Sequence, residues 1–338
     1  MQPLTPRRLA WVCGGLAALL LVAVVISLKV GAVPISMTDL LINLGRVAIG
    51  QSDSLPSDQR MIINEIRLPR ILLGILVGAA LSVAGAGFQA LLRNPLADPY
   101  VLGVSSGAAL GAIFSLIVAE RTTAAMPFAA FAGAAATIGA VYFLGRRGGY
   151  LDSYTLLLAG IISASFLSAV IMFLMTTLSG RDLRGMAFWL MGDLSTPLPV
   201  DLKWLFLVLG LAAGAIYTTA ADLNLLLTGE QEATHLGVDV ARVKLVVYIS
   251  ASLLTGIAVS VSGAIGYVGL LVPHVMRLLF GSDYRLLIPT AALGGAITIV
   301  VADTLARTVV APTELPVGAM TAMAGAPVFI YLLRRRLQ

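Results

Sequence analysis

The chain has 338 residues, of which 59% are hydrophobic and 12% charged, and its mean hydropathy is +0.96. Soluble globular domains carry roughly 45–50% apolar and about 25% charged residues, so this composition excludes a soluble fold and indicates an integral membrane protein. The net charge is +5, but the arginines and lysines stand at the ends of apolar segments rather than in a basic stripe, which argues against nucleic-acid binding.

The first apolar segment follows Arg7 and Arg8 and runs over residues 9–28. Signal peptides have apolar cores of roughly 7–15 residues and a small-residue cleavage site, and this segment fits neither feature. We therefore expect an uncleaved first membrane helix. Its Cys13 is the single cysteine of the chain, which excludes an internal disulfide and a cysteine-based metal cluster.

Ten apolar segments are long enough, or nearly long enough, for the roughly 20 residues that a membrane-spanning helix needs. They lie near residues 9–30, 68–92, 101–119, 126–145, 154–178, 202–220, 243–264, 267–281, 286–306 and 316–333. The segment 267–281 is the shortest and contains Pro273 and His274, so a broken helix buried in protein is expected there. A small excess of basic residues places the N-terminus in the cytoplasm.

Small residues recur at four-residue spacing within these segments, as helices that pack closely in lipid require. Two such rows are Gly103, Gly107 and Gly111, and Gly318, Ala322 and Ala326.

Two short repeated sequence segments relate the two halves of the chain. Residues 82–86 (SVAGA) match 260–264 (SVSGA), and 108–111 (AALG) match 291–294 (AALG). The second and seventh predicted helices then run in opposite directions, which predicts an inverted internal repeat with the transport pathway at the repeat interface.

The longest polar segment on the cytoplasmic side is 222–244. Thr228 and Gln231 have the spacing of a capping box, which predicts a short helix beginning after Thr228 and ending at Gly237. A second short helix is predicted over 239–244. Two short helices at a membrane surface suit docking into a groove on a partner protein, and a plain connecting loop is the alternative.

The chain lacks the residues that would supply its own driving energy. None of its lysines, Lys29, Lys203 and Lys244, follows a glycine, so there is no GxxxxGK[ST] phosphate-binding loop. Asp303 is the only acid deep in a predicted helix, where Arg307 can pair with it one turn on. A proton- or sodium-driven transporter would need paired intramembrane acids. A membrane-embedded enzyme would need His, Asp or Glu clustered at one depth, whereas His235 and His274 are far apart. The two histidines also have no partners at metal-ligand spacing, so we expect no metal site.

Three long segments carry a resemblance to a known family. RLPRILLGILVGAALSVAGAGFQALLRNPLADPYVLGVSSGAALGA (67–112), GYVGLLVPHVMRLLFGSDYRLLIP (266–289) and the segment 302–333 resemble the permease subunits of importers of iron-siderophores, haem and vitamin B12. These are the FecCD-type, or type II, ATP-binding-cassette (ABC) importers. The resemblance covers nearly the whole chain apart from its first sixty or so residues.

The resemblance implies an all-α, polytopic permease of one domain (1–338) in the inner membrane of a bacterium. It implies a homodimer with the pathway along its two-fold axis, two cytoplasmic ATPase subunits and an extracytoplasmic substrate-binding protein. The permease itself would catalyse no reaction and hold no cofactor, because ATP and Mg²⁺ belong to the ATPase.

The resemblance also assigns candidate site residues. Docking of the binding protein falls on Arg67, Arg70 and Arg307. Coupling to the ATPase falls on Gly229, Glu230, Glu232, Ala233, Leu236 and Gly237. The cytoplasmic gate falls on Asn94, Pro95 and Leu96, with a second constriction near Ser153 and Tyr154.

Iron-siderophore, haem and cobalamin permeases share these signatures. Iron chelates, either a ferric siderophore or haem, are favoured because they dominate the family, and vitamin B12 is the alternative. Few aromatic residues and no His/Met/Tyr ligand set stand in the chain, so we expect the permease to pass its cargo without coordinating the metal.

Overall fold

The computed structural model describes residues 5–31, 33, 35–48, 57–118, 125–147, 150–178, 180–195, 201–311 and 313–337. Each of the ten predicted apolar segments coincides with a helix. These helices are α1 (Pro6–Lys29), α4 (Leu68–Leu91), α5 (Val104–Val118), α6 (Met126–Leu144), α7 (Ser153–Met175), α9 (Leu202–Thr218), α12 (Val240–Ser262), α13 (Val268–Phe280), α14 (Tyr284–Ala306) and α15 (Val317–Leu337).

Shorter elements connect the ten apolar helices. They are α2 (Met37–Ala48), α3 (Ser57–Met61), the π-helix η1 (Ile62–Arg67), the 3₁₀-helix η2 (Pro99–Leu102), the two-residue strands β1 (Arg146–Arg147) and β2 (Tyr150–Leu151), α8 (Gly180–Leu190), α10 (Ala220–Leu226) and α11 (Glu230–His235). The antiparallel pair β1–β2 is the only strand pairing in the described ranges, so the chain is all-α as expected.

Length and apolarity separate the ten helices into two groups. Six unbroken helical stretches are long and apolar enough to span a membrane, and α9 with α10 makes a seventh stretch that is bent by 49°. The other three, α5, α13 and α15, are shorter apolar helices. The segment that was expected to be broken is instead one continuous helix, α13, with Pro273 inside it. Its 13 residues rise about 20 Å, less than the roughly 30 Å of hydrocarbon, so the helix is short rather than broken.

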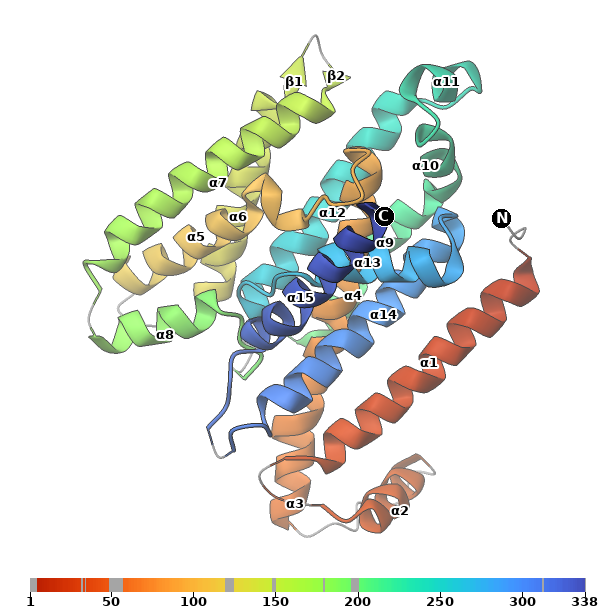
Figure 1. Ribbon diagram of the computed structural model, residues 1–338. Helices are drawn as coiled ribbons and strands as arrows, with labels where there is room; N and C mark the ends of the chain where they lie inside the picture. Colours follow the sequence, from red (N-terminus) through yellow and green to blue (C-terminus); the bar gives the residue numbers. More distant parts are fainter. Residues whose placement is uncertain are drawn as a thin grey trace.

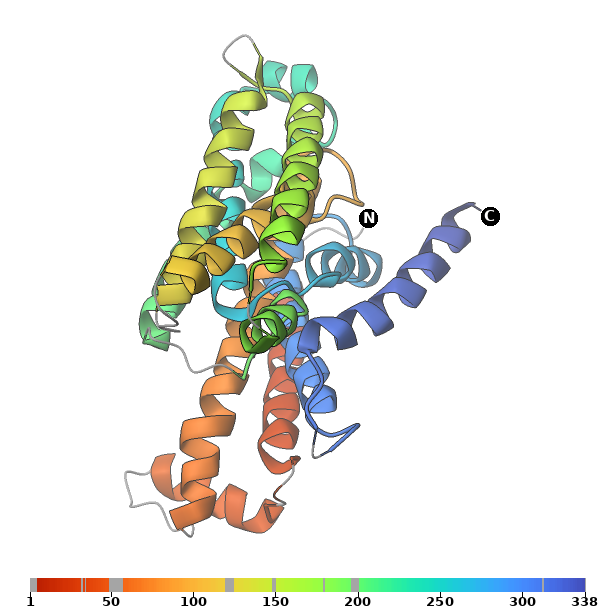
Figure 2. The same cartoon turned by 90° about the vertical axis from the view of Figure 1, so that its left-hand side faces the viewer.

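The bundle has two distinct ends (Figure 1). At one end lie α10, α11 and the β1–β2 pair, and we call it the coupling end. At the opposite end lie α2, α3 and the start of α4, and we call it the arginine end. Helices α4 and α12 run in opposite directions between these ends, as the predicted inverted repeat requires. Helix α15 projects from the body (Figure 2).

Helix α4 forms the centre of the bundle, and glycines let its neighbours approach it closely. A Cβ added at Gly78 would overlap the backbone of Gly295 on α14, and one at Gly85 would overlap Gly269 on α13. Burying leucine against leucine gains little over burying it in lipid tails, so van der Waals contact between small residues holds these helices together.

The predicted rows of small residues have different roles along their length. Gly107 and Gly111 pack against the backbone of α6, as a helix-packing row should. Gly103, in contrast, ends η2 with a φ of 76°, a left-handed conformation that favours glycine. Gly318 packs against the backbone carbonyls of Met191 and Ala264.

That last contact belongs to a cluster of turns between α8, α12 and α15, which we call the interior turn cluster (Gly192, Asp193, Ser262, Gly263 and Val317). The Asp193 N–H donates to the Ser262 carbonyl over 2.8 Å, and the Val317 N–H donates to the Gly192 carbonyl over 3.0 Å. Gly192 and Gly263 have φ values of 82° and 65°. The cluster therefore joins the ends of α8 and α12 to the start of α15 by backbone hydrogen bonds.

Candidate functional sites at the two ends of the bundle

The short helix α11 stands at the coupling end, and glycines fix both of its ends. Gly229 precedes it with φ 136°, and Gly237 follows it with φ 89°. The capping box predicted from Thr228 and Gln231 is wrong, because the Thr228 hydroxyl donates backward to the Leu225 carbonyl and no side chain caps α11. The predicted ends of the helix are otherwise nearly right.

The second short helix predicted in this segment is the first turn of the long helix α12. The carboxylate of Asp239 caps it by accepting from the Arg242 N–H over 3.0 Å. The segment therefore folds as α10, α11 and the start of α12.

Glu230, at the start of α11, joins three parts of the chain. Its Oε1 accepts from Nζ of Lys244 on α12 over 2.7 Å and lies 3.3 Å from a terminal nitrogen of Arg93. The Lys244 side chain is only 6% exposed and also donates to the Leu151 carbonyl over 3.1 Å. A buried ammonium needs both a counter-charge and hydrogen-bond acceptors, and Glu230 and Leu151 supply them.

The two predicted gate segments adjoin helices that are tied together at this end. The Ser153 hydroxyl donates to the Leu91 carbonyl over 3.0 Å, which ties the start of α7 to the end of α4. Asn94 stabilises its own turn by accepting from the Leu96 N–H over 2.9 Å. Tyr154 is largely exposed on α7. The structure thus places Ser153 against the last residue of α4, three positions before Asn94, while Tyr154 is exposed.

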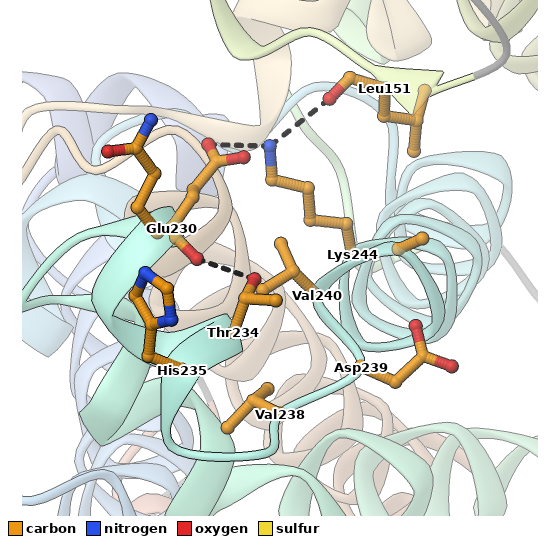
Figure 3. Close-up of a pocket in the computed structure, with 10 residues that line it drawn as sticks. Leu151, Glu230, Thr234, His235, Val238, Asp239, Val240 and Lys244 are labelled. Atoms are coloured by element: carbon orange, nitrogen blue, oxygen red, sulfur yellow. Dashed lines mark hydrogen bonds and ion pairs between the residues drawn. The ribbon is translucent and has the colours of Figure 1, made fainter.

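A groove with a volume of about 680 Å³ lies between α11, α12 and β2 (Figure 3). Glu230 and Lys244 meet at its wall, and the side chains of His235 and Asp239 stand around it. Of the predicted coupling residues in α11, Ala233 is fully buried, whereas Leu236 beyond its end is 64% exposed. Glu232 is exposed too, so this surface presents one apolar and one acidic side chain outward.

Helix α10 is tied to the start of α14 by a second polar contact at the coupling end. Asn224 donates to Asp283 over 2.8 Å and accepts from the Tyr284 N–H over 2.9 Å. Hydrogen bonds from the Arg285 side chain, and then from Asn224, hold the pKa of Asp283 down at about 2. Asp283 is therefore ionised throughout the physiological pH range.

Arg70 and Arg307 share one buried carboxylate at the arginine end. Asp303 accepts from Nε of Arg70 over 2.8 Å and from Nε of Arg307 over 3.0 Å. The second pair is the one-turn pairing on α14 that the sequence predicted. Arg70 also donates to Glu314 over 2.7 Å, and Arg307 donates to the Ser27 hydroxyl over 2.8 Å.

Arg67 lies against the end of α1. Its guanidinium donates to the backbone carbonyls of Leu28, Lys29 and Val33, at and just beyond the last turn of that helix. Cations are favoured at helix C-termini, where the final carbonyls lack intrahelical partners.

The three predicted docking arginines are thus less accessible than their assigned role suggests. The exposed fractions of Arg67, Arg70 and Arg307 are 4%, 7% and 8%. Glu314 is the accessible member of the cluster, since 48% of its side chain is exposed. Sequence reasoning missed Glu314 and the partners of Lys244, because the pairs link residues more than ten positions apart and no local spacing signals them.

Comparison with known proteins identifies the family of the chain that carries these two sites. Residues 19–335 match the FecCD transport family. The chain belongs to the FecCD transport family. It is 44% identical to the cobalamin import system permease protein BtuC of Halobacterium salinarum, over 83% of this chain and 75% of that protein. It is 42% identical to the hemin transport system permease protein HmuU of Yersinia pestis, over 80% of this chain and 82% of that protein.

A solved structure agrees with this assignment. A metal-chelate type ABC transporter in an inward-facing conformation superposes with a TM-score of 0.81 and is 30% identical, covering 96% of this chain and 99% of that one. This FecCD-family chain is therefore a multi-span membrane permease of an ABC importer.

Proposed function

We propose that this FecCD-family permease imports an iron chelate, either a ferric siderophore or haem, through the inner membrane of a bacterium. It works as a homodimer, takes cargo from an extracytoplasmic binding protein and is driven by two ATPase subunits. ATP and Mg²⁺ are held by those ATPases, so the permease itself is not an enzyme. Vitamin B12 is the alternative cargo, since the cobalamin and hemin permeases above are almost equally similar to this chain.

The observation that carries the proposal is the arrangement of α11. A short helix with Glu232 exposed on it and Leu236 exposed just beyond it stands at the coupling end, where Glu230 contacts Arg93, the residue before Asn94. Such a helix suits docking into a groove on an ATPase, from which a displacement of α11 reaches Asn94, Pro95 and Leu96 over a short distance.

Docking of the binding protein is proposed for the arginine end. Carboxylates on the binding protein would meet Arg70 by replacing Glu314, which is its accessible partner. Arg67 and Arg307 would support this site from deeper in the protein. Arg67 binds the end of α1, and Arg307 binds Asp303. Charge pairs of this kind set orientation and association rate more than affinity.

The test is uptake by the permease reconstituted with its ATPase subunits and binding protein in proteoliposomes. Binding protein loaded in turn with a ferric siderophore, haem and cobalamin is added outside, and ATP hydrolysis and cargo entry are measured together. The proposal expects ATP-dependent entry of one iron chelate. Entry of cobalamin alone would favour the alternative, and entry without the ATPase subunits would refute the importer mechanism.

A further inference from the structure

Helix α11 is held to the permease by little apolar surface. Ala233 is its one buried residue, and Val238 is buried just beyond it. The groove of about 680 Å³ separates much of the remaining face of α11 from α12 (Figure 3). Polar contacts therefore take a larger share in fixing the position of α11 than they do for the packed helices of the bundle.

The polar contact that fixes α11 is the carboxylate of Glu230. One oxygen, Oε1, accepts from Lys244 over 2.7 Å and lies 3.3 Å from Arg93. Glu232, in the same helix turn, is different: it is exposed, and its carboxylate folds back over Gly229. The two acids of α11 thus face in different directions, with Glu230 toward the permease.

Each cation that meets Glu230 is also connected to the chain next to a gate segment. Arg93 immediately precedes Asn94 and has a φ of 47°, so its backbone forms the turn that leads into the first gate segment. Lys244 donates to the carbonyl of Leu151, two residues before Ser153. The Glu230 carboxylate is therefore one contact away from the residue that precedes Asn94, and two contacts away from Leu151, which lies two residues before Ser153.

We infer that Glu230 is a positioning residue that transmits the displacement of α11 to both gate segments, through Arg93 to Asn94 and through Lys244 to Ser153. The inference rests on the proposed function, in which the ATPase moves α11. Separating the buried Lys244 ammonium from Glu230 would leave it without its counter-charge, so the two groups are expected to move together. Arg93 is 44% exposed and gives the weaker of the two connections.

The test is the substitution Glu230→Gln, which keeps the shape of the side chain and removes its charge. The measured quantity is the coupling ratio, the number of cargo molecules imported per ATP hydrolysed by the reconstituted complex. We expect ATP hydrolysis to be retained and the coupling ratio to fall by roughly tenfold, because the neutral amide loses the charge-assisted hydrogen bond from Lys244. The matched control is Glu65→Gln, the same substitution at an exposed acid on η1 at the opposite end of the bundle, which should leave the ratio unchanged.

A charge exchange distinguishes transmission from simple assembly. Glu230→Lys alone should uncouple the complex. Adding Lys244→Glu restores an ion pair between α11 and α12, but the new carboxylate cannot donate to the Leu151 carbonyl and the new ammonium faces Arg93, so the coupling ratio should stay low. Recovery of the ratio in this double variant would show that pairing of α11 with α12 is sufficient, and it would overturn the inference. If Glu230→Gln lowered ATPase binding and hydrolysis in proportion to uptake, Glu230 would only assist assembly and the inference would be overturned. A wild-type ratio in Glu230→Gln would overturn it too. A wild-type complex without ATP-dependent uptake would instead refute the proposed function.

Discussion

The shared carboxylate at the arginine end offers the sharpest test of the structure. Asp303→Asn keeps the size of the side chain and removes the one negative charge between Arg70 and Arg307. The new amide still accepts a hydrogen bond through its oxygen, but its NH₂ group turns a donor toward the second guanidinium. Arg70 then retains Glu314, and Arg307 retains the neutral hydroxyl of Ser27.

The magnitude follows from the burial of the cluster. Each guanidinium–carboxylate attraction amounts to about 4 kcal/mol at an effective dielectric constant near 20. Desolvation offsets much of it, and removing one partner of a buried pair typically costs about 3–5 kcal/mol. Since the substituted side chain keeps one acceptor, we expect the lower end, about 3 kcal/mol. An unfolding entropy of roughly 2.1 cal/mol/K per residue over 338 residues corresponds to about 1.4 °C per kcal/mol, so the melting temperature should fall by about 4 °C.

The assay is thermal unfolding of the detergent-purified permease, followed by its intrinsic tryptophan fluorescence. Asp222→Asn is the control and should melt within about 1 °C of the wild type. The triple variant Arg70→Met, Asp303→Leu, Arg307→Met should recover most of the stability, because apolar residues replace the whole buried ionic cluster. It should not bind the binding protein. If Asp303→Asn alone melted like the control, the arginines would not depend on this carboxylate and the reasoning would fail.

Three further outcomes are expected. Gly78→Ala should destabilise the permease by about 1–3 kcal/mol, because its methyl group overlaps the α14 backbone; Gly139→Ala, which meets no atom within 4 Å, should be neutral or stabilising in the same melting assay. Glu314→Gln should tighten docking of the binding protein by roughly two- to fivefold in surface plasmon resonance, since the competing exposed partner of Arg70 is worth under about 1 kcal/mol. Weaker docking would contradict the replacement of Glu314. The folded-state pKa of Asp283 is depressed to about 2, so its stabilisation is complete above about pH 4 and is lost as pH falls toward 2. Acid titration should show this loss, on the order of 1–2 kcal/mol, in the wild type and not in Asp283→Asn.

The sequence predicted the spanning helices because lipid imposes a simple rule on them. Every backbone polar group must be paired inside the membrane, so an apolar run of sufficient length has to be helical. The same kind of rule gave the Asp303–Arg307 pair, because two opposite charges one turn apart on an apolar helix have strong reason to meet. Neither inference depends on what the rest of the chain does.

The amphipathic helices α2 and α8 were not predicted, because each is too short and too polar to register as a membrane segment. Thr228 matched a capping pattern, yet its hydroxyl found a nearer acceptor in Leu225. Local spacing identifies which groups can pair, but competition among acceptors is settled by the three-dimensional arrangement. The burial of Arg67 beneath the end of α1 was hidden for the same reason.

The interior turn cluster restricts where this protein can flex. The helix ends that meet at Gly192, Ser262 and Val317 are hydrogen-bonded to one another across long stretches of chain. Sliding any one of them alone would strand donors and acceptors away from water, which is costly in a lipid environment. Relative movement is therefore directed to places without such long-range hydrogen bonds, such as the 49° bend between α9 and α10, where Thr219 bonds only to residues within one turn of it.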